Sequence, residues 1–468
     1  MVILYKSLTE GRIMSSQKIA VKDLTKGPIL PQLLSLAWPM MVTMTLQLVY
    51  NVVDMAVVGH AMGKIGLSAT AIGGELTQFF IVFSAGLAIG GQVLIGTFIG
   101  KGEKDRISEV IGTHISTAVI IGIIINILLL ICGPLFLHWM NTPEEAYAQA
   151  CSYVFTCSFG YIFIYGYDAI AAAFRATGNS RSTLIFIAVS SVINLLLDFL
   201  FVNGLHWQAF GAALATVIGQ IAAFAASALY LYKMRKGLEL DLSLKTFIPK
   251  KDLLGPLLKI GLPTGMQFCA VAFSMLMTSS WVNAFGTAVS AANGAGGKLR
   301  KIMQIMTKSM HGAGAVIISQ SMGAQNVERV KKVMAIVWKV CMIYWLVIAA
   351  ICVLFPEQIF SIFTKDAEVL AVSHEYMPSF AVWIFTLAFM SPFMALANGL
   401  GEPKFNVAMG LVDGVFARIG LSLLFGVTLG MGYLGFWYGN ALAGVATIII
   451  GAAYYLSGKW KTHKVIKK

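Results

Sequence analysis

Two stretches of the sequence decide the fold, and they are copies of one pattern. Residues 89–95 read Ile89-Gly90-Gly91-Gln92-Val93-Leu94-Ile95, and residues 312–318 read Gly312-Ala313-Gly314-Ala315-Val316-Ile317-Ile318. The same offset of 223 pairs further positions: Gly73–Leu76 with Gly296–Leu299, Gly100 with Gly323, Arg106 with Arg329, Tyr153 with Tyr376, and Gly178 with Gly401. So many matches in one register indicate an internal repeat, and the chain is predicted to consist of two halves with the same fold.

The composition places both halves in a membrane. The chain has 468 residues, of which 58% are hydrophobic and only 12% are charged. Soluble domains carry roughly twice that share of charged residues. The composition therefore excludes a soluble enzyme, a disordered chain and an ordinary nucleic-acid-binding protein. The net charge of +13 then reflects orientation in a bilayer, and no nucleic-acid partner is expected.

Twelve apolar stretches are long enough to cross the hydrocarbon core, which needs about 20 residues. They cover residues 33–59, 70–99, 108–133, 146–173, 182–202, 209–232, 257–285, 295–322, 330–354, 371–397, 405–427 and 433–456. Most of the 34 Lys and Arg residues fall on one side of these spans. Since an excess of positive charge marks the cytoplasmic side, both termini are predicted to be cytoplasmic. The basic residues expected on the opposite side are Lys64, Lys298, Arg300, Lys301 and Lys365.

Six spans in each half mean that both halves enter the membrane from the same face. The predicted fold is an all-α integral membrane protein with twelve transmembrane helices in two six-helix bundles. The bundles are parallel repeats, related by a pseudo-twofold axis along the membrane normal. The predicted parts are a cytoplasmic N-terminal segment (1–32), an N-terminal bundle (33–232), a cytoplasmic linker (233–256), a C-terminal bundle (257–456) and a cytoplasmic tail (457–468). No cleaved signal peptide is expected, and either Met1 or Met14 serves as the start.

Such an architecture is typical of carriers that rock two halves about a central site. The chain has no phosphate-binding Gly-x-x-x-x-Gly-Lys-Ser/Thr motif; the nearest match, Gly296-Gly297-Lys298, continues with Leu299. Without a nucleotide site, the energy source is expected to be an ion gradient or the gradient of the substrate. The sequence therefore predicts a secondary transporter, with no cofactor. The absence of a nucleophile–base set or metal cluster argues against an enzyme.

A few polar residues inside the spans are candidate functional residues, because each is costly in hydrocarbon. Asp54 ends a long apolar run within the first span, fifteen residues after Pro39, which is expected to kink that helix. Asn194 and Asp198 are four residues apart and share one helix face, and Thr216 lies on the next span. Their oxygen atoms suit a hard cation such as Na⁺. Two carboxyl groups in contact away from water would also share a proton, so Asp54, Asn194, Asp198 and Thr216 are predicted to form an Na⁺ or H⁺ site.

The remaining intramembrane candidates have weaker assignments. Asp168 is expected either in a substrate cavity or in a helix-packing hydrogen bond. Asp413 and Arg418 are five residues apart, which on an α-helix turns them about 140° from each other, so they need not pair. Glu75 and Lys298 occupy equivalent repeat positions near the outer mouth and are expected either to pair when that side closes or to remain solvated. Met266 is assigned to the substrate cavity, because flexible thioethers suit promiscuous sites.

Taken together, these pieces resemble the multidrug and toxic compound extrusion (MATE) transporters of the multidrug/oligosaccharidyl-lipid/polysaccharide exporter superfamily. The resemblance covers about residues 28–457 and rests on four motifs: Asn51-Val52-Val53-Asp54 with Val58-Gly59-His60, residues 174–180 (Phe-Arg-Ala-Thr-Gly-Asn-Ser), Asn194-x-x-x-Asp198, and residues 211–216 (Gly-Ala-Ala-Leu-Ala-Thr). It implies that Pro39, Asp54, Asn194, Asp198 and Thr216 form the cation site of the N-terminal bundle. Tyr153 is expected close to Asp54 and is assigned to the substrate cavity. The NorM-type branch has a glutamate shortly after the Gly-Leu-Pro of the seventh span, where this chain has Phe268–Val271. The chain therefore resembles the DinF-type branch more closely.

The leading interpretation is a multidrug efflux antiporter that exchanges cationic or amphipathic compounds for Na⁺ or H⁺. It is expected to work as a monomer in the plasma (inner) membrane, with small-molecule substrates and the lipid bilayer as its partners. The alternative within the superfamily is a lipid-linked oligosaccharide flippase, whose cavity should hold several Arg or Lys. The charged residues assigned to the membrane interior comprise five acidic residues (Asp54, Glu75, Asp168, Asp198 and Asp413) and three basic residues (Lys308, Lys339 and Arg418), which favours cationic or neutral substrates. An ion channel or sensor is less consistent with the repeat.

Overall fold

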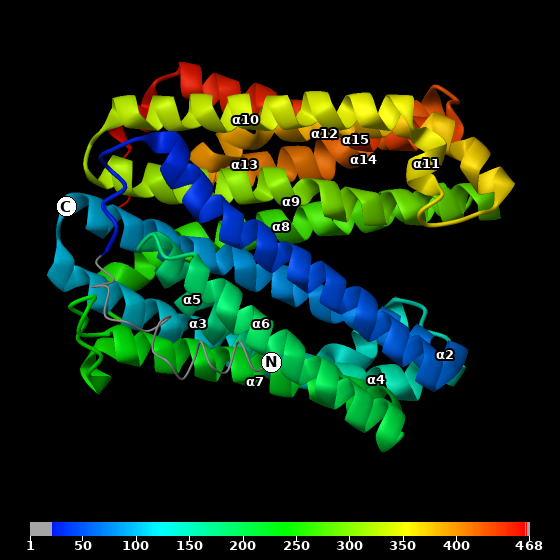
Figure 1. Ribbon diagram of the computed structural model, residues 1–468, viewed down its shortest axis with the longest axis horizontal. Helices are drawn as coiled ribbons and strands as arrows, with labels where there is room; N and C mark the ends of the chain where they lie inside the picture. The colour runs from blue at the N-terminus through cyan, green and yellow to red at the C-terminus, as the bar shows by residue number, and fades with distance from the viewer. Residues whose placement is uncertain (1–20, 464, 466–468) are drawn as a thin grey trace.

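The computed structural model describes residues 21–463 and 465, and every regular element within them is a helix. The alternative start at Met14 and most of the predicted N-terminal segment lie outside the described residues. Figure 1 shows the helices gathered into two bundles that lie side by side. The N-terminal bundle comprises α2 (Ile29–Lys101), α3 (Lys104–Trp139), α4 (Glu144–Ser158), α5 (Tyr161–Ala176), α6 (Arg181–Asp198), the π-helix η1 (Phe199–Gly204) and α7 (Gln208–Met234).

The C-terminal bundle follows a linker that contains the short helix η2 (Leu244–Phe247). Its elements are α8 (Lys251–Asn283), α9 (Thr287–Gly323), α10 (Val327–Leu354), α11 (Pro356–Phe360), α12 (Ala367–Leu400), α13 (Pro403–Gly410), the π-helix η3 (Leu411–Ala417), α14 (Arg418–Leu423), the π-helix η4 (Leu424–Thr428), α15 (Gly432–Leu456) and the terminal 3₁₀ turn η5 (Lys459–Thr462). All twelve predicted spans have a helical counterpart in these two bundles.

The structure differs from the sequence prediction in two details. Helix α2 contains two apolar segments, Ile29–Met55 and Ile65–Lys101, and Figure 1 shows its two arms running back alongside each other. The fourth span is broken: α4 and α5 meet at an angle of 46°. Among the described residues ten segments are long and apolar enough to cross a membrane, and the α4–α5 pair adds one more. Helix α9 is the twelfth, and it is too polar to be counted with the others.

The expected pseudo-twofold axis is visible in reciprocal contacts between the second arm of α2 and α9. A Cβ atom built on Gly100 would lie 1.9 Å from the backbone oxygen of Gln320, and one on Gly323 would lie 2.2 Å from the backbone oxygen of Thr97. Thr97 and Gln320 are themselves one repeat offset apart. Contacts that interchange in this way are the signature of a twofold relation. The prediction of two parallel repeats is therefore confirmed at the level of individual contacts.

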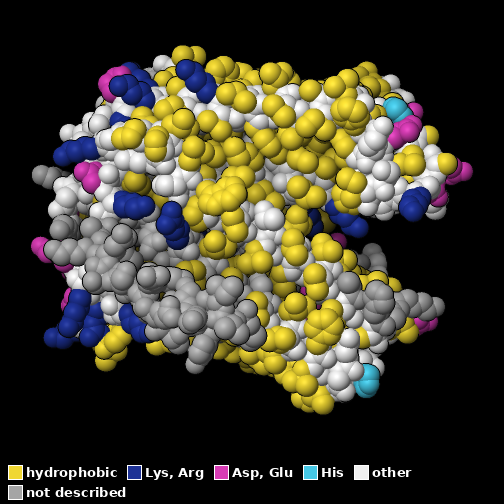
Figure 2. Space-filling view, viewed as in Figure 1, with side chains coloured by type: hydrophobic (Ala, Val, Ile, Leu, Met, Phe, Trp, Pro, Cys, Tyr) yellow, Lys and Arg dark blue, Asp and Glu magenta, His cyan; other side chains and the backbone are white. Residues whose placement is uncertain are grey.

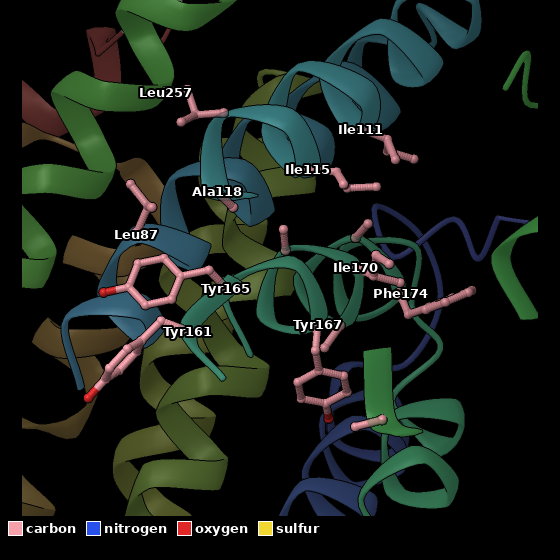
Figure 3. Close-up of a cluster of buried hydrophobic side chains, with 14 of the residues drawn as sticks. Leu87, Ile111, Ile115, Ala118, Tyr161, Tyr165, Tyr167, Ile170, Phe174 and Leu257 are labelled. Atoms are coloured by element: carbon pink, nitrogen blue, oxygen red, sulfur yellow. The ribbon is translucent and has the colours of Figure 1, made fainter. Parts of the chain in front are cut away.

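The two bundles touch at the end where α2 finishes and the described chain ends, which we call the terminal end. There the first arm of α2 packs its Leu33, Leu36 and Ala37 into a core formed mainly by α9, α10 and α12. Leu87 of the second arm and Leu257 of α8 belong to the core of the N-terminal bundle, part of which is drawn in Figure 3. Toward the opposite end the bundles separate, and Figure 2 shows a deep notch between them. The structure thus has a cleft that is closed at the terminal end.

The segment before each repeat is fixed by an equivalent arginine. Arg329 donates hydrogen bonds to the backbone oxygens of Leu24 (2.7 Å) and Gly27 (2.8 Å), which precede α2. Arg106, its partner in the repeat, forms an ion pair with Asp252 at the start of α8. These two residues explain why the Arg106/Arg329 match recurs in the sequence.

Glycines on the second arm of α2 allow the closed seam to form. A Cβ atom at Gly86 would lie 2.4 Å from the Cα atom of Gly265 on α8, so no side chain fits there. We expect Gly86→Val to separate the bundles at the terminal end and to shift the protein toward a conformation open at that end. The measurement is the crosslinking of cysteine pairs placed across the seam, for example at positions 97 and 320. Gly74→Val is the control, because a Cβ atom there has no neighbour within 4 Å; equal crosslinking in both variants would contradict the prediction.

Candidate functional site

The candidate cation site begins at the last turn of α6. Asn194 and Asp198 lie on one face of this helix, as their four-residue spacing predicts, and both are buried, with 2% and 0% of their surface exposed. The α-helix ends at Asp198 and continues as the π-helix η1. Local π-helical turns widen the backbone and are frequent at functional sites. The burial of a carboxylate at this position calls for a partner cation or a proton.

Helix α7 supplies the hydroxyl group of the cluster. The amide nitrogen of Asn194 donates to Oγ1 of Thr216 at 3.4 Å, and that hydroxyl donates to the backbone oxygen of Ala212 at 3.0 Å. Tyr50, on the first arm of α2, lies beside Thr216 and close to the two carboxylates. Three helices thus converge on one polar spot in an otherwise apolar bundle.

Asp54, also on the first arm of α2, completes the cluster. Its carboxyl group lies within hydrogen-bonding reach of that of Asp198. Oδ1 of Asp54, both carboxylate oxygens of Asp198 and Oδ1 of Asn194 are buried, and no described residue donates a hydrogen bond to any of them. Four buried acceptor oxygens without a donor, gathered in one place, are suited to bind a hard cation such as Na⁺ or to share a proton.

This donor set does not suit a transition metal. No group of three or more His, Cys, Asp or Glu residues converges anywhere in the described part of the chain. The cluster offers two carboxylates, one amide oxygen and one hydroxyl, which are hard ligands for an alkali cation. Tyr153 of α4 packs against the same region, in a small apolar group with Val58, Val202 and Ala212.

The repeat places an equivalent cluster in the C-terminal bundle, where the residue types are inverted. In this region the offset between the repeats is 224. The same turn occurs in both: the backbone N–H of Leu205 donates to the oxygen of Leu200, and that of Leu429 donates to the oxygen of Leu424. The residues that correspond to Asp54, Asn194, Asp198 and Thr216 are Thr278, Arg418, Ser422 and Asn440. Arg418 contacts Oδ1 of Asn440, just as Asn194 contacts Thr216. The C-terminal bundle thus carries a fixed guanidinium cation where the N-terminal bundle has an anionic cluster.

The buried Arg418 is neutralised by Asp413, contrary to the expectation from their spacing. The guanidinium lies 3.0 Å from Oδ1 of Asp413, and both residues are buried, with 5% of their surface exposed. Residues 411–417 form the π-helix η3, whose wider turn brings positions five apart onto one face. The expectation that these residues point about 140° apart was wrong, because it assumed α-helical geometry. Aligning the two repeats would have placed Arg418 opposite Asn194, inside the C-terminal bundle, but would not have identified Asp413 as its partner.

The other candidates do not join the cation cluster. Asp168 accepts a hydrogen bond from Oγ of Ser84 at 2.7 Å, between α5 and the second arm of α2. Met266 lies on an exposed apolar stripe of α8, with 65% of its surface exposed. Glu75 and Lys298 are both exposed, and no ion pair joins them in this conformation.

Pro39 lies inside α2, as predicted. Because proline has no backbone N–H, the carbonyl oxygen of Ser35 has no hydrogen-bond donor at position 39. It is buried on the first arm, in the half that packs against the C-terminal bundle. Asp54 lies fifteen residues further along the same arm. The first arm therefore connects the seam between the bundles with the candidate cation site.

Comparisons with known proteins agree with this geometry. The MatE family profile matches residues 39–200 and 263–424, once in each repeat. The chain is similar to the "Probable multidrug resistance protein YoeA" of Bacillus subtilis (26% identity, covering 92% of this chain and 94% of the relative). It is also similar to a "Probable multidrug resistance protein NorM" of Thermotoga maritima (22% identity, covering 93% and 94%).

A solved structure described as the outward-facing conformation of a multidrug resistance MATE family transporter of the MOP superfamily has the same fold. It superimposes with a TM-score of 0.86 over 97% of this chain and 100% of that chain, at 21% identity. These relatives are multidrug transporters and not enzymes. Because the family profile covers most of the chain and recurs in both repeats, the protein belongs to the MatE family of multidrug efflux transporters.

Proposed function

We propose that this protein exports amphipathic organic compounds in exchange for Na⁺ or H⁺ bound at the Asp54–Asp198 cluster. The observation that carries the proposal is the group of buried carboxylate and amide oxygens that no described residue neutralises. A bound cation would stabilise these oxygens, so its arrival and departure can change the packing of the first arm of α2 around them. That arm also packs against the C-terminal bundle, which links the ion site to the seam between the bundles.

We further propose that the coupling ion binds only in the N-terminal bundle. In the C-terminal bundle the equivalent position is filled by the guanidinium of Arg418, paired with Asp413. An internal cation held in this way leaves no anionic site for Na⁺ and no exchangeable proton. The arrangement agrees with a closer relation to the DinF-type than to the NorM-type branch.

The proposed setting follows from the charge pattern. The protein would reside in the plasma membrane as a monomer, with both termini cytoplasmic and the cleft of Figure 2 open to the outside. A lipid-linked oligosaccharide flippase is the second candidate function, favoured by one observation: four basic side chains lie on α9 within the C-terminal bundle.

Transport in proteoliposomes tests the proposal. Purified protein would be given cationic, neutral and anionic fluorescent amphipaths under an imposed Na⁺ or pH gradient. We expect at least one compound to move against its own gradient, and this movement to stop when an ionophore dissipates the driving gradient. If no compound in the panel moves in a gradient-dependent way, the proposed antiport is wrong.

A further inference from the structure

Helix α9 is unusually basic for a membrane-spanning helix. It carries Lys298, Arg300, Lys301 and Lys308, together with Gln304 and His311. The charge pattern of the sequence assigned the first three to the outer side of the membrane, but the structure places them within the helix Thr287–Gly323. The count of five acidic against three basic intramembrane residues, from which cationic or neutral substrates were expected, left out these three basic residues, which belong to the same helix as Lys308.

All six polar side chains lie on one face of α9. At 100° per residue they fall within an arc of about 160°. Gly312 lies inside this arc and meets the side chain of Met40 on the first arm of α2. The opposite face holds Gly314, which packs against Val337 of α10 and Ala395 of α12. Lys298, Lys301 and Lys308, which lie within about 40° of Gly312 around the helix, are thus directed toward the N-terminal bundle, whereas Arg300 lies at the edge of the arc nearest Gly314 and contacts Tyr376 of α12.

This basic face opens onto the cleft. Near the terminal end it is covered by α2, but further along the bundles diverge, and Lys298, Lys301 and Lys308 are exposed. Lys308 lies near the middle of the helix, where contact with hydrocarbon would cost several kcal/mol. Figure 2 shows basic side chains at the wall of the notch formed by the upper bundle. We conclude that these side chains project into water inside the cleft.

The positive charge of this face is not neutralised by the protein. Arg300 donates to the hydroxyl of Tyr376 at 2.6 Å, and among the described residues no carboxylate forms an ion pair with any of the four basic side chains. The equivalent positions on the second arm of α2 are Glu75, Thr77, Gln78 and Ala85, with a single acidic residue. The nearby intramembrane carboxylates have other partners: Asp168 accepts a hydrogen bond from Ser84, and Asp413 forms an ion pair with Arg418.

We propose that the basic face of α9 binds the anionic group of an amphipathic substrate, such as a carboxylate or a phosphate. The inference rests on the proposed efflux function and names the class of substrate. Lysines in a water-filled cleft attract an anion and raise its local concentration, while the apolar part of the substrate can remain against the surrounding apolar helix surfaces. The anionic group can belong to a soluble organic acid or to the phosphate of a lipid-linked molecule, and the test separates these sources.

Neutralising variants of the cleft lysines test the proposal. We expect Lys301→Gln/Lys308→Gln to raise the KM for a carboxylate-bearing fluorescent amphipath roughly tenfold, as loss of charge-assisted hydrogen bonds predicts, and to leave the transport of a cationic dye unchanged or faster. Lys301→Arg/Lys308→Arg should retain the wild-type KM. Lys339→Gln is the matched control, an exposed lysine on α10, whose basic side chain lies outside the α9 face. A second arm replaces the soluble dye with a fluorescent lipid phosphate in the vesicle bilayer and measures its translocation.

The outcomes are distinct for the two proposals. A raised KM with the soluble dye alone assigns an organic acid, and an effect confined to the lipid phosphate assigns a lipid-linked substrate. Gradient-driven transport of cationic dyes, with no anionic compound moved and no effect of the double variant, would overturn the anion site and leave the antiport intact. Loss of all transport in the Gln variant together with the Arg variant would also count against an anion site, because the Arg variant preserves the charge.

Discussion

Replacing Asp198 by Asn is expected to abolish gradient-driven transport while the protein still folds. The substitution keeps the shape of the side chain but removes one of the two carboxylates of the cluster. Since the affinity of oxygen-ligand sites depends on their charge, the cation should bind at least about tenfold more weakly. The side-chain amide of the new Asn can also donate a hydrogen bond to the unpaired oxygens of the cluster, which stabilises the site without a bound cation. The measurement is substrate movement in proteoliposomes under the gradient that drives the wild-type protein.

The matched control for this variant is Asp168→Asn. Asp168 is a carboxylate of the same bundle, but it is satisfied by Ser84 and lies outside the cation cluster. We expect it to retain ion-coupled transport, and thermal unfolding of both variants should show that the folds are comparable. Gradient-driven transport at the wild-type rate in Asp198→Asn would show that the ion binds elsewhere. An equal loss of gradient-driven transport in both variants would show that removing any carboxylate of this bundle impairs transport, and that Asp198 has no specific role in binding the ion.

Much of the fold could be predicted from the sequence because its determinants are repetitive. Apolar length defines the spans, and the fixed offset between the halves requires a twofold relation, which the reciprocal contacts of Gly100 and Gly323 reveal. The break between α4 and α5 was not predicted, because residues 146–173 are uniformly apolar enough for one span. Helix α9 was predicted as the span 295–322, but the charge pattern assigned Lys298, Arg300 and Lys301 to the outer side of the membrane. The sequence does not show that these side chains belong to the same helix wall as Lys308, because that depends on how the two bundles separate.

The cation cluster was only partly accessible to sequence reasoning. The spacing of Asn194 and Asp198 defines a shared helix face without any tertiary information. The proximity of Asp54 depends on how the first arm of α2 packs against α6, which no local pattern encodes. It could be proposed only because isolated carboxyl groups are costly inside a membrane, and the resemblance to the family supports the same grouping. The pair Asp413–Arg418 escaped for a different reason. Its geometry depends on a π-helical turn, and the residue types of η3 do not distinguish it from an α-helix.

Separating Asp413 from Arg418 is expected to cause the largest loss of stability in the C-terminal bundle. Arg418→Met leaves a buried carboxylate without its cation, and Asp413→Leu leaves a guanidinium bound only to Asn440. Breaking a buried pair in this way costs about 3–5 kcal/mol, whereas exchanging both partners for apolar residues is often neutral. The double variant should therefore unfold at a higher temperature than either single variant. Thermal unfolding of the four purified proteins measures this difference.

The same double variant separates a structural from a coupling role of the pair. If Arg418 is a permanent substitute for the coupling ion, the protein with neither charge should keep gradient-driven transport, because its only exchangeable cation binds at Asp54 and Asp198. If the C-terminal bundle instead releases and rebinds a proton at Asp413, the double variant would fold well and lose coupling. Single variants as stable as the wild type would show that the pair contributes little to the fold. We expect the double variant to retain both stability and coupling, because Arg418 occupies in the C-terminal bundle the position that the coupling ion occupies in the N-terminal bundle.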